Sequence, residues 1–148
     1  SDLACYRVCS YVILKEKQTG KDFVVFNTHL DHISDEARIN GIRVVLDKIA
    51  QFGGKPSIIM GDFNAKENSE TYKMATENFN DAKYLTDNPD NSCTYQNFGK
   101  ALDRSCIDYF MISKTGVTAQ SFEIVKNTYD GVYPSDHFPI AVTLTLTD

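Results

Sequence analysis

Apolar stretches of strand length recur along the chain, separated by polar turns. Residues 4–14 and 22–30 are rich in Val, Ile, Tyr and Phe, and the polar residues 17–21 between them read as a turn. This pattern predicts a β-hairpin. Four further strands are predicted from a short apolar stretch and three longer ones, at residues 57–60, 106–113, 117–126 and 138–146.

Helical spacing of apolar residues appears between these strands. A helix is predicted to begin at Ser34, a plausible N-cap that is followed by acidic residues, and to end near Gly53-Gly54. Its apolar positions share one face, which we expect to pack on a sheet: Ile39, Ile42, Leu46 and Ile49. A second, weaker helix is predicted at residues 68–77. The 148 residues, 42% of them hydrophobic, suffice for one domain spanning residues 1–148.

Four short polar clusters lie at the ends of the predicted strands. Two of them follow their strands and two precede theirs. In a sheet with antiparallel neighbours, the end of one strand and the start of the next lie on the same edge. We therefore expect one rim to carry all four clusters, which are Asn27-Thr28-His29, Gly61-Asp62-Phe63-Asn64, Ile107-Asp108-Tyr109 and Ser135-Asp136-His137.

The second of these clusters has the residue types of a hydrolytic site. In an extended segment, Asp62 and Asn64 would share one face while Phe63 turns toward the core. A carboxylate in this position could take a proton from water, and the amide could orient that water or a phosphate. The alternative is an ordinary Asx turn that closes a loop.

The last two clusters combine carboxylates with a histidine. Asp136 is a natural ligand for a hard cation, and His137 could contact a reacting phosphate. Asp108 opens an otherwise apolar strand and would need a partner, for which a histidine is suited. The alternatives are a solvated turn with a surface histidine, and a strand-end charge that faces water.

The first cluster adds two further candidates. Asn27 and His29 are two positions apart and so share a face, although His29 could also be a histidine satisfied at a strand end. Asp31 and His32 follow directly, but an Asp and a His without further ligands are weak evidence for a transition-metal site. They are left outside the candidate site.

The charge balance limits the class of partner. Fifteen basic and 20 acidic residues give a net charge of −5, which disfavours a protein that holds nucleic acid mainly through phosphate contacts. A phosphorylated substrate would then be met locally, through a bound cation. Arg38 and Arg43 are predicted on the solvated face of the helix, and Arg104 is a loop charge whose role stays open.

Cysteine spacing and hydropathy bear on the compartment. The four cysteines show no C-x-x-C spacing, so reduced thiols are expected, although a Cys93–Cys106 bridge stays open. Cys5 and Cys9 would lie about 13 Å apart along a strand, too far for a bridge. No apolar run is long enough to span a membrane and no leader is visible, so we expect a soluble chain of unspecified location.

Four segments together resemble the C-terminal half of the endonuclease/exonuclease/phosphatase family, the deoxyribonuclease-like, metal-dependent phosphoesterases. They occur in order across residues 23–146 and read FVVFNTHLDH, PSIIMGDFNAKENSETY, CIDYFMIS and YPSDHFPIAVTLTL. The resemblance implies an α/β (α+β) fold, in which a β-sandwich of two mainly antiparallel sheets is flanked by helices. It also implies hydrolysis of a phosphodiester or phosphomonoester with Mg²⁺ or Mn²⁺.

The resemblance further implies a role for each candidate. Asp62 would activate water, and Asn64 would position that water or contact phosphate. Asp108 would orient and charge-stabilise His137, which would contact the scissile phosphate. The remaining three candidates would touch the cation or the phosphate oxygens, Asp136 as a ligand of Mg²⁺ or Mn²⁺ and Asn27 and His29 as phosphate contacts.

The family's N-terminal half supplies an asparagine and a metal-binding glutamate that have no counterpart here. We therefore expect an N-terminally truncated domain that exposes apolar sheet, unless a missing half or self-association covers it. The alternative function is a catalytically silent binding or interaction module, or an inactive fragment of such an enzyme. The acidic balance favours a small or exposed phosphorylated substrate over duplex DNA, and nucleic acid stays open.

Overall fold

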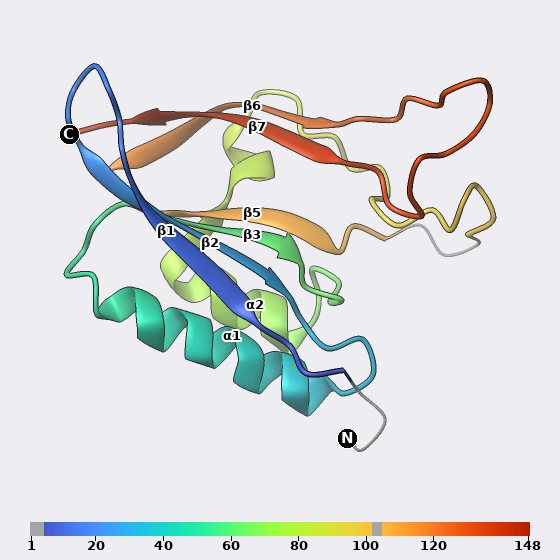
Figure 1. Cartoon of the computed structure of the whole chain (residues 1–148), viewed down its shortest axis with the longest axis horizontal. Helices are drawn as coiled ribbons and strands as arrows, with labels where there is room; N and C mark the ends of the chain where they lie inside the picture. The colour runs from blue at the N-terminus through green and yellow to red at the C-terminus, as the bar shows by residue number, and fades with distance from the viewer. Residues whose placement is uncertain (1–4, 102–104) are drawn as a thin grey trace.

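A computed structural model describes residues 5–101 and 105–148, and it places two β-sheets face to face (Figure 1). The larger sheet has the strand order β1-β2-β3-β5-β4, with β2 and β3 parallel and the other neighbours antiparallel. Its strands are β1 (Cys9–Lys15), β2 (Asp22–His29), β3 (Ser57–Asp62), β4 (Phe79–Asp81) and β5 (Asp108–Ser113). The smaller sheet pairs β6 (Val117–Ile124) with β7 (Ile140–Leu146) in antiparallel fashion.

Two α-helices cover the outer face of the larger sheet (Figure 1). Helix α1 (Asp35–Ala50) begins as predicted, because the Ser34 side chain accepts a hydrogen bond from the Ala37 N–H. Helix α2 (Glu70–Asn78) is capped in the same way by Ser69, and a short 3₁₀ helix, η1 (Ala82–Leu85), follows β4. The predicted α/β sandwich is confirmed, with its helices on one side; β4 and η1 had no sequence signal.

Alternating side chains of the larger sheet build two cores. On β2, Val24 and Phe26 point toward the helices and belong to the main core, whereas Phe23 and Val25 point toward the smaller sheet. The main core also contains residues of both helices and of β3 and β5, including Ile42, Ile59, Ala75, Tyr109 and Met111. The second core, between the two sheets, is centred on Ile58, Ala82, Ile112, Val117 and Ala119. This layering fixes the strand ends that carry the polar clusters.

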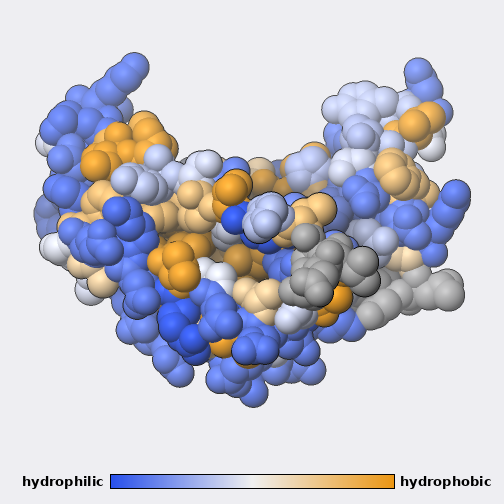
Figure 2. Space-filling model, turned by 60° about the horizontal axis from the view of Figure 1, so that its bottom comes forward, coloured by the Kyte–Doolittle hydropathy of each residue, from blue (hydrophilic) through white to orange (hydrophobic). Residues whose placement is uncertain are grey.

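Strand β1 is an edge strand with exposed apolar side chains, as expected for an uncovered sheet edge. Four consecutive residues of β1 are 41–51% exposed: Tyr11, Val12, Ile13 and Leu14. Figure 2 shows a hollow in the surface between two largely hydrophilic projections, with hydrophobic side chains gathered in and beside it. An edge strand with apolar exposure is a surface on which further chain can pair.

Several smaller expectations can be compared with the structure. The first strand begins at Cys9 rather than at residue 4, and the last begins at Ile140 rather than at residue 138. The four cysteines are free, so the Cys93–Cys106 bridge is not formed. Among the described residues, no helix combines the length and the hydropathy needed to cross a lipid bilayer.

The two helix arginines differ from each other. Arg43 is exposed and donates to the Asn40 side chain, as predicted for a solvated face. The prediction for Arg38 was wrong, because its side chain is only 11% exposed. Its guanidinium donates to the Asp31 carbonyl oxygen at 2.9 Å and pairs with Asp35, which holds the start of α1 against the preceding loop. Arg104 lies outside the described residues.

Candidate active site

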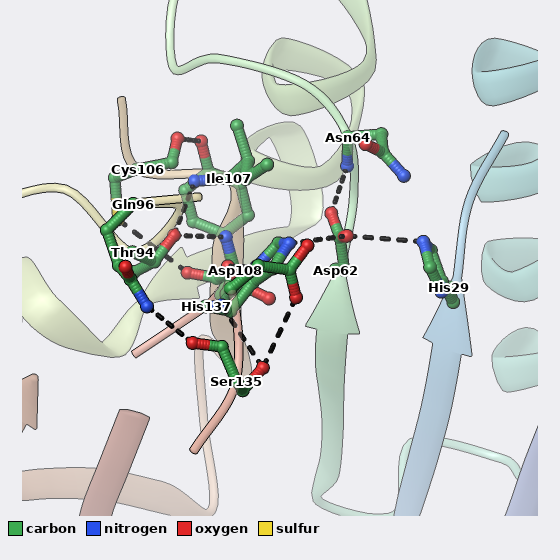
Figure 3. A network of polar contacts seen from close by, with 12 residues as sticks. His29, Asp62, Asn64, Thr94, Gln96, Cys106, Ile107, Asp108, Ser135 and His137 are labelled. Carbon is green, nitrogen blue, oxygen red and sulfur yellow. Dashed lines mark hydrogen bonds and ion pairs between the residues drawn. The ribbon is translucent and has the colours of Figure 1, made fainter. Parts of the chain in front are cut away.

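Three of the polar clusters meet at the ends of adjacent strands β2, β3 and β5. In the parallel pairing of β2 with β3, His29 lies opposite Asp62, and in the antiparallel pairing of β3 with β5, Asp62 lies opposite Asp108. Asp62 therefore lies between the other two side chains at one rim of the sheet (Figure 3). The fourth cluster joins them through the contact of His137 with Asp108, and a β-bridge pairs His137 with Tyr95.

The close approach of β2 and β3 requires glycine at position 61. Gly61 has φ +134°, and a Cβ atom there would lie 1.9 Å from the Thr28 carbonyl oxygen. No side chain can occupy that space unless the two strands separate. Gly61 therefore sets the distance between the strand ends that carry His29 and Asp62.

The Asp62 carboxylate lies between two imidazoles. Its Oδ2 is 3.2 Å from Nε2 of His29 and 3.8 Å from Nε2 of His137. The other ring nitrogen of His137, Nδ1, lies 2.8 Å from Oδ2 of Asp108. The structure thus forms the chain Asp108–His137–Asp62–His29, drawn in Figure 3, and Asp108 does have the histidine partner that its strand position calls for.

Burial and these contacts shift two pKa values. Burial raises the pKa of Asp62, and the nearby charge of Asp108 raises it further, against a hydrogen bond from the Asn64 N–H that lowers it. The hydrogen bond to Asp108 raises the pKa of His137, against a smaller opposing effect of burial. Asp62 is therefore easier to protonate than a free carboxyl, and His137 holds its proton more firmly than a free imidazole.

Asn64 departs from the predicted extended conformation. It has φ +48°, in the left-handed region, and its N–H donates to Asp62 Oδ1 at 2.7 Å, so the Asx turn considered as an alternative is present. Its side-chain amide donates to the Leu30 carbonyl oxygen at 3.1 Å. Phe63 is fully buried, as predicted. The turn itself orients the Asp62 carboxylate.

Thr94 holds two of the clusters in place and was missed in the sequence. Its hydroxyl oxygen accepts hydrogen bonds from the N–H groups of Ile107, at 3.0 Å, and Asp108, at 3.3 Å. Its carbonyl oxygen accepts from the N–H of Phe138 at 2.7 Å. One fully buried threonine thus links the segment that carries Asp108 to the segment that carries His137.

Gln96 fixes the loop before His137 and was also missed. Its side-chain amide donates to the Ser135 carbonyl oxygen at 2.6 Å, and its side-chain oxygen accepts from the N–H of Gly99. The backbone N–H of Gln96 donates to the Asp136 carbonyl oxygen at 2.9 Å. No periodicity or motif marks residues 94–96, so the sequence offered no signal for them.

Two adjacent clefts open at this rim. The first, of about 350 Å³, is lined by Arg7, His29, His32, Asp62, Asn64, Tyr95, Ile107, Asp136 and His137. The second, of about 370 Å³, is lined by Tyr6, Arg7, Val8, Ser10, Asn27, Thr28, His29, Gly61 and Asp62. Five of the candidate residues thus line the first cleft and Asn27 lines the second, while Asp108 lies behind His137.

The oxygen donors at this rim can supply part of a site for a hard cation. Among the described residues, donor atoms of Asp62, Asp108 and His137 lie within 4.8 Å of one another. These atoms already pair with each other, and Asp136 is outside this group although it lines the same cleft. Mg²⁺ is commonly held by one or two carboxylates together with water and substrate phosphate. Asp136 fits such a partial site.

The comparisons with known proteins agree with this arrangement. The model of the endonuclease/exonuclease/phosphatase family matches residues 5–137, which are nearly the whole chain. The chain belongs to this family. Comparison with curated protein sequences found no match.

Solved structures of several bacterial proteins have the same fold. One from Bacteroides vulgatus is 31% identical, with a TM-score of 0.86 over 97% of this chain and 57% of its own. A mannosyl-6-phosphatase from Bacteroides thetaiotaomicron is 29% identical, with a TM-score of 0.83 over 95% of this chain and 57% of its own. A protein of unknown function from Enterococcus faecalis is 32% identical, with a TM-score of 0.86 over 94% of this chain and 56% of its own. This chain thus spans little more than half of each.

Proposed function

We propose that this family member hydrolyses a phosphoester by in-line attack of an activated water, with a divalent cation. The observation that carries the proposal is the position of Asp62 Oδ2 between the imidazoles of His29 and His137, at a cleft large enough for a phosphoryl group. A carboxylate and an imidazolium that face the same space can remove a proton from water and stabilise charge on phosphate oxygens.

Asp62 is the general base in this proposal. Its Oδ1 is held by the Asn64 N–H, which leaves Oδ2 directed at the cleft. The raised pKa of the carboxyl strengthens it as a proton acceptor. Asn64 lines the same cleft and would orient the attacking water or a phosphate oxygen.

His137 is the group that stabilises charge on the phosphoryl oxygens. Asp108 accepts the Nδ1 proton of the ring and so directs Nε2 into the cleft. The edge-to-face contact with Tyr95, with ring centroids 5.1 Å apart, holds the ring plane from the other side. A protonated His137 would donate to a phosphoryl oxygen as negative charge develops there.

Three residues would complete the contacts of the substrate phosphate and the cation. His29 lines both clefts, and Asn27 lies two positions before it on the same face of β2. We assign both to phosphate oxygens, and Asp136 to Mg²⁺ or Mn²⁺. A bound divalent cation would supply Lewis acidity and neutralise charge on the phosphate.

A small phosphomonoester is the substrate class best supported. One relative of similar fold, 29% identical, carries the name mannosyl-6-phosphatase, and the net charge of −5 disfavours binding of duplex DNA through phosphate contacts. A nucleotide with an exposed phosphoester meets the same requirements.

Hydrolysis of a panel of phosphoesters tests the proposal. The panel would contain a sugar 6-phosphate, a nucleotide and a generic diester, each with Mg²⁺, with Mn²⁺ and with chelator. Turnover that needs the cation and falls at least about a hundredfold in His137→Ala supports the proposal. Turnover that survives chelation or the substitution contradicts it.

A catalytically silent binding module is the second candidate. It is favoured by the position of Asp136 outside the only three-donor cluster found among the described residues, so that the carboxylate assigned to the cation has no second ligand beside it in that cluster. Calorimetric titration with Mn²⁺ separates the candidates. Specific binding that is lost in Asp136→Ala supports the enzyme, and absence of binding supports the silent module.

A further inference from the structure

Arg7 lies where the two clefts meet, and no role described so far uses it. It lines both clefts, together with His29 and Asp62. The segment before β1 carries it to the rim of the sheet, close to the ends of β2 and β3. An arginine at this point can reach a group bound in either cleft.

The hydrogen bonding of Arg7 leaves its charge available. Its Nη2 lies 2.8 Å from Nδ1 of His32, and because a guanidinium can only donate, Nδ1 accepts. Within residues 5–101 and 105–148, Arg7 forms no ion pair with a carboxylate.

One donor of the same side chain is without a partner. The Nε atom of Arg7 is buried, and it has no hydrogen-bond partner among the described residues. This arrangement does not serve stability, because a buried donor without an acceptor destabilises the fold. The contact of Nη2 with His32 instead fixes the place of the guanidinium beside the two clefts that Arg7 lines.

The place of Arg7 differs from that of the residues that would act on the scissile phosphate. The two ion pairs of Asp62 are made with His29 and His137, and Arg7 is in neither. Its positive charge instead acts on Asp31, in the loop that follows β2. Arg7 thus lies beside the proposed reaction centre rather than over it.

We propose that Arg7, held by its contact with His32, binds a second phosphate group of the substrate, next to the phosphate that is attacked at Asp62. The planar guanidinium matches the geometry of two phosphate oxygens, which a lysine at this place could not do. The second phosphate can come from a small bisphosphorylated molecule or from the neighbouring nucleotide of an oligonucleotide. The inference rests on the proposed function for the identity of the first phosphate.

Binding of inorganic anions tests the site without requiring activity. Pyrophosphate carries two linked phosphates and orthophosphate one, so calorimetry with each, in chelator, compares two phosphates with one. The wild-type chain should bind pyrophosphate about tenfold more tightly than orthophosphate, and Arg7→Gln should lose this preference. The control Arg43→Gln, which removes an exposed arginine of α1, should retain it.

Two results would overturn the inference. The first is equal affinity of the wild-type chain for both anions, which includes no binding of either. The second is an Arg7→Gln variant that keeps the preference for pyrophosphate over orthophosphate while its circular dichroism matches that of the wild type. If Arg7→Gln unfolds, Arg7→Lys provides the same test. Lysine keeps the positive charge but lacks the planar pair of N–H donors that can bind two phosphate oxygens at once. The lysine variant should keep only part of the preference.

Hydrolysis then identifies the source of the second phosphate. Values of kcat/KM would be compared for a hexose bisphosphate against the monophosphate, and for a 5′-phosphorylated dinucleotide against the unphosphorylated one. The substrate pair whose ratio of kcat/KM values falls in Arg7→Gln identifies the source of the second phosphate. Hydrolysis with no Arg7-dependent ratio in either pair contradicts this inference alone, whereas anion preference without any hydrolysis contradicts the proposed function alone.

Discussion

Asp108 and His137 are joined by a 2.8 Å contact between the carboxylate Oδ2 and the ring Nδ1, although they lie 29 positions apart in the chain. A carboxylate can only accept, so the contact places a proton on Nδ1 and points Nε2 toward Asp62. The same contact is the main cause of the raised pKa of His137. A protonated His137 is therefore available at higher pH than a free imidazole would allow.

Replacing Asp108 should shift the pH dependence of activity. If His137 acts protonated, turnover in the wild type falls as the pH rises through its pKa, above the ordinary value of 6.5. Asp108→Asn removes the main cause of the shift, so the fall should begin at lower pH. A profile of kcat/KM between pH 5 and 9 measures this. If Asp108→Asn stays active and its kcat/KM falls at the same high pH as in the wild type, His137 does not act as an acid.

Asp62→Asn should leave stability at pH 7 equal or higher. The folded-state pKa of Asp62 is raised, so the folded state favours the protonated form, and ionisation costs stability as the pH rises through that pKa. The amide removes this cost. Thermal unfolding at pH 7 and at pH 3 should show any gain only at pH 7.

The control for this substitution is Asp31→Ala. Asp31 accepts from the N–H groups of Ile33 and Ser34, and these hydrogen bonds lower its pKa. Its contribution to stability is present above the unfolded pKa and is lost as the pH falls through the folded one. Asp31→Ala should therefore lower Tm at pH 7. A large loss of Tm in Asp62→Asn as well would contradict the stated electrostatics.

Gly61→Ala should be strongly destabilising. The new methyl would lie 1.9 Å from the Thr28 carbonyl oxygen, in the left-handed region of φ, so the strand ends must part. We expect a loss on the order of 3 kcal/mol in urea unfolding. Gly20 also has a positive φ, of +74°, but a Cβ atom there would have no atom within 4 Å. Gly20→Ala should therefore lower the free energy of unfolding by only about 1 kcal/mol. Equal losses would show that only φ matters.

Thr94→Val should lower both stability and activity. Valine has the same shape as threonine but leaves the N–H groups of Ile107 and Asp108 without their acceptor, at a cost of about 2 kcal/mol. The segment with Asp108 would then hold His137 less firmly, so kcat should fall. Thr94→Ser keeps the hydroxyl and should retain most of the activity. Urea unfolding and steady-state kinetics on the two variants provide the measurements.

The elements and the rim were predictable because local patterns determine them. On β2, alternate residues face opposite cores, and Ser34 caps α1 where its sequence context predicts. The polar clusters end or begin strands, and strand pairing alone brings three of them together. The conformation of Asn64 was not predictable in this way, since an extended segment and an Asx turn use the same residues.

The residues that the sequence did not reveal depend on long-range contacts in irregular loops. Gln96 bonds to Ser135, 39 positions later, and Arg7 meets His32, 25 positions later. Loop residues follow no period, so a hydrophobic pattern carries no information on them. Arg38 was misplaced for the same reason, because its burial depends on the path of the loop at Asp31.

The most direct test of the account is kcat/KM for a phosphomonoester with Mg²⁺, measured on the wild-type chain and on Asp62→Asn. The account predicts hydrolysis by the wild type and a loss of about a hundredfold to ten-thousandfold in the variant, with circular dichroism unchanged. Equal kcat/KM in the two folded proteins would contradict it, because Asp62 would then not activate the water.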